Sequence, residues 1–184
     1  MKRYCLYLFI LIGISCSAEL KAQKNGTVYK GNDPAVRYTG RTLVSPDGSV
    51  AFDWVGTYLE TRFTGGKLSV KVSETGTSYY NVFVDGKLHK VVKVCGTDTL
   101  IHLVSGIDKR IHSLKIQKRS EGEFGKTTVH QFVLSGSGRL AEEPAVRTRH
   151  IEFIGNSLTC GYGTDGKHRD EPFLVETENC NLTF

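Results

Sequence analysis

The clearest structural signal in the chain is Asn81-Val82-Phe83-Val84-Asp85-Gly86-Lys87-Leu88. The residues on either side of Asp85-Gly86 form strand-like runs. An Asp-Gly pair readily adopts the positive φ angles that a two-residue hairpin turn requires. The stretch therefore predicts a β-hairpin.

Short strand-like segments recur from Val36 to about Leu134. In Leu68-Ser69-Val70-Lys71-Val72 the apolar and polar side chains alternate with period two, which is typical of a half-buried strand. No window of about 12 residues keeps a helical period. Turn signals separate the segments at Pro46-Asp47-Gly48, Gly65-Gly66 and Ser105-Gly106. We expect strands over residues 36–41, 50–55, 58–64, 67–73, 79–84, 88–94, 99–104, 112–118 and 129–134.

About nine strands in about 100 residues would expose an apolar face if they formed one flat sheet, whereas two packed antiparallel sheets bury it. We therefore expect a mainly β chain with a jelly-roll-type β-sandwich over residues 28–137. Trp54 falls on one of the predicted strands. The favoured interpretation is a half-buried packing residue, and the alternative is a platform on which a sugar stacks.

The first 22 residues have the pattern of a secretory signal peptide. A basic start at Met1-Lys2-Arg3 precedes an apolar run from Tyr4 to Ile14, and small and polar residues lead to a cleavage site after Ala22. The apolar run is shorter than the about 20 residues that a membrane span needs. We expect a secreted or periplasmic protein without a membrane span. Lipid attachment at Cys16 is a minor alternative, because the acceptor site lacks the usual Leu three residues earlier.

The remaining charge and cysteines exclude several classes of partner. The formal charge is +5, and removal of three cations and one anion with the signal leaves +3. No basic stripe remains, which argues against a nucleic-acid partner. No Cys-x-x-Cys spacing exists, so we predict no metal site, and no motif indicates a cofactor. Cys95, Cys160 and Cys180 remain, and a Cys160–Cys180 bridge and buried free thiols both stay open.

The composition changes after residue 137. Residues 138–149 contain small, charged and proline residues without periodicity and predict a linker. Residues 150–184 then form a different unit, in which His150–Ile154 reads as a strand and Gly155-Asn156 leads into Ser157. A serine on a tight turn after a buried strand projects its hydroxyl at the carboxyl end of a sheet, where α/β folds build their sites. Ser157 is therefore a candidate nucleophile, and its backbone N–H is a candidate oxyanion donor.

The serine turn lies in Ile151-Glu152-Phe153-Ile154-Gly155-Asn156-Ser157-Leu158-Thr159-Cys160-Gly161-Tyr162-Gly163, which resembles the first block of the SGNH (GDSL-type) hydrolases. The order of sandwich, linker and serine block resembles carbohydrate esterase family 2, where a jelly roll precedes an α/β SGNH domain. The resemblance extends to Phe52-Asp53-Trp54-Val55-Gly56-Thr57-Tyr58 and Glu176-Thr177-Glu178-Asn179-Cys180.

The resemblance implies a serine esterase that removes acetyl groups from acetylated plant-type polysaccharides or oligosaccharides such as those of xylan or mannan. Ser157 matches the nucleophile of the family, and Gly155 and Asn156 support its turn. The family usually has Asp before the serine. Asn156 keeps the size of that residue and loses its charge. The alternative function is a carbohydrate-binding β-sandwich without catalysis.

A serine nucleophile needs a base, which is normally a histidine held by a third group. In SGNH hydrolases that histidine lies in a block near the C-terminus, and this chain runs only 27 residues beyond Ser157. A literal Asp165-Gly166-Lys167-His168 begins eight residues after Ser157, in a loop-like stretch, and we reject it as the base. His150, before the strand, is expected at the surface. We expect the base and the further oxyanion donors to lie outside these 184 residues, so that the chain is an inactive fragment with an incomplete SGNH domain.

Overall fold

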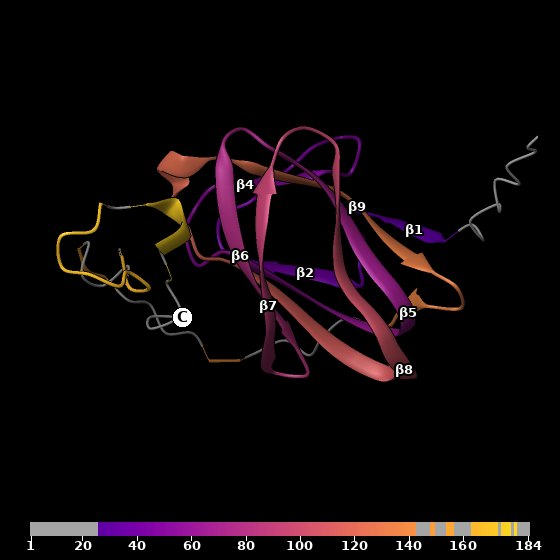
Figure 1. Ribbon diagram of the computed structural model, residues 1–184. Coiled ribbons are helices and arrows are strands. Elements are labelled where there is room, and N and C mark those ends of the chain that lie inside the picture. Colours follow the sequence, from indigo (N-terminus) through magenta and orange to yellow (C-terminus); the bar gives the residue numbers. More distant parts are fainter. Residues whose placement is uncertain are drawn as a thin grey trace, which may run out of the picture.

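The computed structural model describes residues 26–142, 148–149, 154–156, 163–172, 174–177 and 179, and it is built almost wholly of strands (Figure 1). Two short 3-10 helices, η1 (Gly122–Phe124) and η2 (Val175–Thr177), accompany them. The strands are β1 (Thr27–Lys30), β2 (Val36–Thr39), β3 (Leu43–Val44), β4 (Val50–Phe52), β5 (Tyr58–Glu74), β6 (Thr77–Val84), β7 (Lys87–Cys95), β8 (Thr99–Lys118), β9 (Thr127–Ser135) and β10 (Arg139–Leu140).

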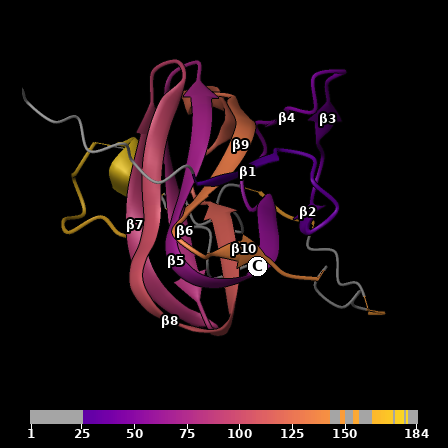
Figure 2. The same ribbon diagram turned by 90° about the vertical axis from the view of Figure 1, so that its right-hand side faces the viewer.

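The strands pair in the order β3-β4-β9-β5-β8-β6-β7, and every described pairing is antiparallel. The first half of β5 pairs with β2 and with the second half of β8, which in turn pairs with β6. The second half of β5 pairs with β9 and with the first half of β8. The two halves lie in two layers that share β5 and β8 (Figure 2). The prediction of a mainly β sandwich of two antiparallel layers is confirmed.

Glycines bend the two shared strands where they pass from one layer to the other. The register between β5 and β8 shifts around Gly66, whose φ is +86°, and Gly106 has a φ of 71°. A Cβ on Gly66 would lie 2.4 Å from the carbonyl oxygen of Ser135, so only glycine fits there. The prediction that strands end at these glycines was wrong, because a bulge inside a strand and a turn between strands use the same residue.

The predicted hairpin is confirmed. Asp85 and Gly86 have φ angles of 50° and 75°, and they join β6 to β7, in which Val84 pairs with Lys87. Both turn residues therefore adopt the left-handed region that a two-residue turn of this kind requires.

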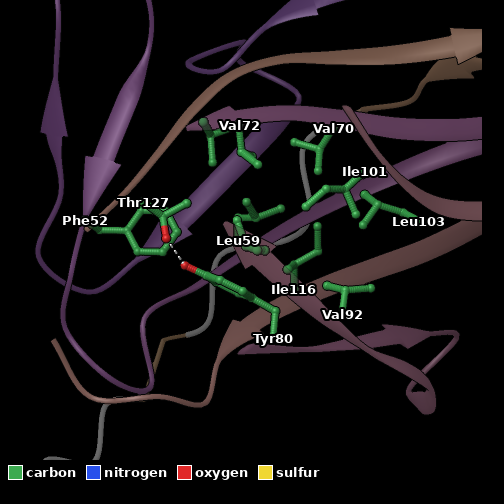
Figure 3. Close-up of a pocket in the computed structure, with 12 residues that line it drawn as sticks. Phe52, Leu59, Val70, Val72, Tyr80, Val92, Ile101, Leu103, Ile116 and Thr127 are labelled. Atoms are coloured by element: carbon green, nitrogen blue, oxygen red, sulfur yellow. Dashed lines mark hydrogen bonds between the residues drawn. The ribbon is translucent and has the colours of Figure 1, made fainter. Parts of the chain in front are cut away.

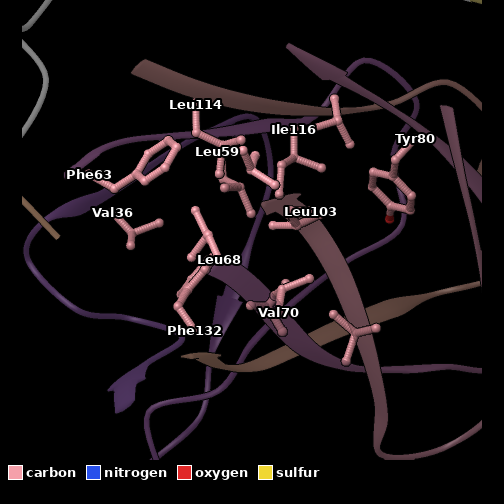
Figure 4. Close-up of a cluster of buried hydrophobic side chains, with 14 of the residues drawn as sticks. Val36, Leu59, Phe63, Leu68, Val70, Tyr80, Leu103, Leu114, Ile116 and Phe132 are labelled. Atoms are coloured by element: carbon pink, nitrogen blue, oxygen red, sulfur yellow. The ribbon is translucent and has the colours of Figure 1, made fainter. Parts of the chain in front are cut away.

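The core fills the space between the two layers (Figure 4). Leu59 and Phe63 enter it from the first half of β5, and Leu68 and Val70 enter it from the second half. Because both halves of one strand supply the core, the bend at Gly65-Gly66 brings the apolar faces together. The other buried apolar residues of this cluster are Val36, Phe52, Val72, Tyr80, Val82, Val94, Leu103, Val104, Leu114, Ile116, Val129, Phe132, Leu134 and Leu140.

A cavity of about 20 Å³ lies within this core (Figure 3). Aliphatic side chains line most of it, and the hydroxyl of Tyr80 is bonded to that of Thr127, which in turn donates to Glu74. Burial raises the pKa of Tyr80 well above its usual range, so the phenol is neutral. An apolar cavity of this size is a packing defect rather than a ligand site.

The sandwich extends two residues beyond the predicted start of the linker at residue 138. Arg139 and Leu140 form β10 and pair with Thr64 and Phe63 of β5. Leu140 is buried in the core, and its backbone N–H donates to the hydroxyl of Tyr29. A strand of two residues is too short to show periodicity, so the sequence of residues 139 and 140 could not be distinguished from that of the linker.

The predicted signal peptide, residues 143–147 of the predicted linker and all of the predicted strand at 150–154 except its last residue lie outside the described residues. Within the described part, neither short helix has the length or the apolar character that a membrane crossing needs.

Candidate functional site

The candidate nucleophile Ser157 lies outside the described residues, as do Cys160 and Cys180. Gly155 and Asn156, which lead into the serine, are described, and both are exposed. The described residues nearest to the serine are therefore 154–156 before it and the loop of residues 163–172, 174–177 and 179 after it.

The loop after the serine block is closed on itself. Gly163 has a φ of 70°, and the N–H of Gly166 donates to its carbonyl over 2.9 Å. The N–H of Asp165 donates to the carbonyl of Thr177 over 2.9 Å, which ties the turn to η2. Figure 1 shows this segment beside β6. The turn at 163–166 and η2 thus form one unit next to that strand.

Arg119 anchors this unit to the sandwich. It directly follows β8, and its side chain is 5% exposed. Its Nη2 pairs with the carboxylate of Asp165 and lies 3.4 Å from the carbonyl oxygen of Glu176, while its Nη1 lies 3.4 Å from Asn81 Oδ1. A buried guanidinium requires such a partner, because an unpaired buried charge is strongly destabilising.

Two asparagines complete the anchor. The fully buried Asn81 of β6 donates from Nδ2 to Asn179 Oδ1 over 3.2 Å. Asn179 in turn donates from Nδ2 to both carboxylate oxygens of Asp165, each at 3.3 Å. Asp165 is therefore held by one residue of the sandwich and by one residue of the C-terminal segment.

The literal Asp-x-x-His stretch does not form a catalytic pair in this arrangement. The carboxylate of Asp165 bonds to Arg119 and Asn179, while His168 is exposed and donates its backbone N–H to Glu171 Oε2 over 3.3 Å. Asp165 thus holds the loop in place rather than orienting the imidazole of His168.

Two serine–histidine pairs that were not predicted from the sequence lie on the outward side of the layer formed by β9, the second half of β5 and the first half of β8. Ser69 Oγ lies 2.8 Å from His102 Nδ1, and Ser73 Oγ lies 2.8 Å from His130 Nε2. Asp98 approaches that same Nε2 at 3.8 Å. A catalytic carboxylate holds the opposite ring nitrogen from the serine, so the group of Ser73, His130 and Asp98 is a structural cross-strand contact.

Trp54 lies in the loop between β4 and β5 and is 63% exposed. The favoured interpretation of a half-buried packing residue was therefore wrong. The sequence places Trp54 next to strand-like residues, but the chain turns there, since the N–H of Thr57 donates to the Trp54 carbonyl. Gly56 bonds to the carbonyl of Lys118, which places this loop near Arg119.

Among the described residues, no cluster of three or more His, Cys, Asp or Glu residues could hold a metal ion. Cys95 is exposed and is a free thiol.

Comparison with known proteins identifies the sandwich. Residues 38–144 match the family model described as Carbohydrate esterase 2 N-terminal. The chain is 32% identical over 153 residues to the cellulase/esterase CelE of Acetivibrio thermocellus, covering 83% of this chain and 19% of that protein. It is 29% identical over 135 residues to an acetylxylan esterase / glucomannan deacetylase of Cellvibrio japonicus, covering 73% of this chain and 37% of that protein.

A solved structure supports the same relationship. The family two carbohydrate esterase from Clostridium thermocellum, in complex with cellohexaose, superposes with a TM-score of 0.75 at 32% identity, covering 80% of this chain and 45% of that chain. The chain therefore spans less than half of each of these relatives. The match over residues 38–144 covers more than half of this chain, which belongs to carbohydrate esterase family 2.

Proposed function

We propose that the protein acts as an extracytoplasmic serine esterase of the SGNH type that removes acetyl groups from plant-type polysaccharides such as xylan or mannan. The observation that carries this proposal is the position of the Gly155-Asn156-Ser157 block, which follows a sandwich of carbohydrate esterase family 2 in the sequence. The names of two relatives, which include acetylxylan esterase and glucomannan deacetylase, support the substrate class.

The proposed reaction is acyl transfer to water in two steps. The hydroxyl of Ser157 attacks the acetyl carbonyl, its proton passes to a base, and the sugar hydroxyl leaves with a proton. Water then attacks the acyl-serine and releases acetate. The backbone N–H of Ser157 stabilises the oxyanion in both steps. Because the carboxylate of Asp165 is bonded to Arg119, we expect the base to be a residue outside the Asp165–His168 stretch.

The test is hydrolysis of an acetylated xylan and of a model acetate ester by the protein extended with any coding sequence that follows codon 184. We expect Ser157→Ala to lower kcat by about 10³-fold or more. Ser73→Ala is the matched control, because it removes a serine hydroxyl that also bonds to a histidine. Activity should survive in the control, and equal rates for wild type and Ser157→Ala would sink the proposal.

An assay of the 184-residue chain alone tests whether the base is His168 or a histidine outside these 184 residues. The proposal expects no turnover from it, since the described residues offer no oriented base. Serine-dependent turnover by this chain would restore His168 as the base.

A non-catalytic carbohydrate-binding role is the second candidate, and the exposure of Trp54 favours it. An exposed indole offers a flat apolar face on which a sugar ring can stack. Affinity electrophoresis in xylan and in glucomannan gels tests this role. Trp54→Ala should abolish retardation, whereas Leu43→Ala, which removes an equally exposed apolar side chain from β3, should not. Equal retardation of Trp54→Ala and wild type would exclude the Trp54 platform.

The proposed export of the protein rests on the signal-like residues 1–22. Cell fractionation and N-terminal sequencing of the exported form test it. A start at Gln23 is expected, and a fatty-acid label on Cys16 would instead support lipid attachment.

A further inference from the structure

The backbone of Arg119 is held as firmly as a strand residue. Its N–H donates to the carbonyl of Tyr79 over 3.0 Å and so continues the pairing of β8 with β6. The neighbouring Lys118 turns into the interior, where Nζ donates to Ser78 Oγ over 2.6 Å and to the carbonyl of Gly125 over 3.0 Å. Successive strand side chains point to opposite faces, so Arg119 is directed outward, towards Asp165 and Glu176.

The ion pair between Arg119 and Asp165 favours one position of the turn at residues 163–166 relative to the sandwich. The guanidinium is always charged and is 5% exposed, and the partner carboxylate is 42% exposed. Moving the loop away would break the ion pair of a guanidinium that is almost fully buried, and breaking a buried ion pair is strongly destabilising. Asn81 and Asn179 add directional hydrogen bonds to the same pair, so the contact fixes orientation as well as distance.

Asp165 is close in sequence to the nucleophile. It lies eight residues after Ser157, and its turn is closed by the bond between Gly166 and Gly163. A nucleophile placed wrongly by about 1 Å can lose about 10²-fold in rate. A fixed point this near to the serine block is therefore in a position to affect catalysis.

A second residue on the outward side of β8, Gln117, also indicates that this face packs against a further polar segment. Gln117 lies two residues before Arg119, between Tyr58 of β5 and Asn81 of β6. Its side chain is 1% exposed, and both its amide nitrogen and its amide oxygen lack hydrogen-bond partners in the described part of the chain. Burying an unsatisfied amide is unfavourable, so this face is suited to a further polar partner.

We propose that Arg119 is a positioning residue for the esterase reaction. Through Asp165 it fixes the turn that follows the Ser157 block against the sandwich, so the sandwich contributes to kcat and is more than an appended module. This inference rests on the proposed esterase function.

The test uses the whole protein and compares wild type with Arg119→Ala, Arg119→Lys and Asp165→Asn on a soluble acetate ester. We expect Arg119→Ala and Asp165→Asn each to lower kcat by about 10–100-fold with KM changed by less than about twofold. Arg119→Lys should recover part of the loss, because an ammonium still pairs with Asp165 but lacks the planar fork. The kcat of the double variant Arg119→Ala/Asp165→Asn should be no lower than that of the less active single variant, since both substitutions remove the same contact.

A second measurement follows the nucleophile without a substrate. A fluorophosphonate probe reacts with an activated serine, and its rate of labelling Ser157 should fall in parallel with kcat. His112→Ala is the matched control for lost stability. It disrupts a buried polar cluster seven residues earlier in β8, and well below its unfolding temperature it should keep the wild-type kcat and labelling rate.

The outcomes separate the two proposals. If Ser157→Ala keeps wild-type activity, the esterase proposal fails and the role of Arg119 fails with it. If Ser157→Ala is inactive while Arg119→Ala and Asp165→Asn keep the wild-type kcat and labelling rate, only the role of Arg119 is overturned. If Arg119→Ala does not fold, Arg119→Lys and Asp165→Asn decide the question by the same two readouts.

Discussion

His112 Nδ1 lies 2.7 Å from Asp85 Oδ2, so a buried imidazole of β8 holds the turn of the β6–β7 hairpin. The other ring nitrogen, Nε2, lies 2.9 Å from Asp108 Oδ1. With a carboxylate on each nitrogen, the ring is best satisfied as the imidazolium, which donates from both. Burial alone would lower the pKa of His112, but the two carboxylates outweigh it and raise the pKa above 6.5.

This cluster predicts a pH range of maximal stability. The pKa of His112 is raised on folding, so its stabilisation is complete below pH 6.5 and is lost as the pH rises through the folded-state pKa. The hydrogen bonds from His112 and from the backbone of Ser113 lower the pKa of Asp85 below 3.8, so its stabilisation is lost as the pH falls through that lower value. The cluster therefore stabilises the fold most between pH 3.8 and 6.5.

Urea unfolding at pH 5 and at pH 8 measures the effect. The loss of stability on His112→Gln should be larger at pH 5 than at pH 8, and Asp85→Asn should reduce that difference. Parallel pH profiles of wild type and His112→Gln would contradict the assignment of the imidazolium.

Leu103 and Leu100 of β8 predict a contrast within one strand. Leu103 is fully buried between the layers, while Leu100 is 49% exposed. Leu103→Ala removes packed methyl groups and should lower the free energy of unfolding by about 2–5 kcal/mol. Leu100→Ala should change it by less than about 0.5 kcal/mol. Similar losses in chemical denaturation would show that the core does not lie where the two layers meet.

Substitution by alanine should destabilise the fold by different amounts at Gly86 and at Gly31. Gly86 has a φ of 75° and open space around it, so Gly86→Ala should cost about 1–2 kcal/mol from backbone strain alone. A Cβ on Gly31 would lie 2.3 Å from the carbonyl oxygen of Val129, so the chain would have to move. Gly31→Ala should therefore have the larger effect on the thermal midpoint, and the reverse order would contradict the described approach of β9.

The sequence predicted the kind of fold because its local signals agree with its tertiary structure. The alternation in Leu68–Val72 places Val70 and Val72 in the core, and Asp85-Gly86 forms the predicted turn. The continuity of β5 and β8 was missed, because a glycine such as Gly66 suits both a bulge and a turn. Only the neighbouring strand, whose Ser135 oxygen approaches Gly66, distinguishes the two.

The anchor of the candidate site could not be predicted in the same way. Arg119 follows a strand in a run of polar residues, and such an arginine usually lies at a solvated surface. Its burial depends on Asp165, which is 46 residues away in sequence. The only local signal was a literal Asp-x-x-His motif, and the structure assigns its Asp165 to Arg119 rather than to His168.

The passage of β5 and β8 through both layers has a consequence for how the domain opens. A sandwich of two separate sheets can part along the plane between them, but here both layers contain part of β5 and part of β8. Breaking the ladder in one layer therefore frees a strand on which the other depends. The slowest amide protons of both halves of β5 should thus exchange with solvent at one common rate, that of global unfolding.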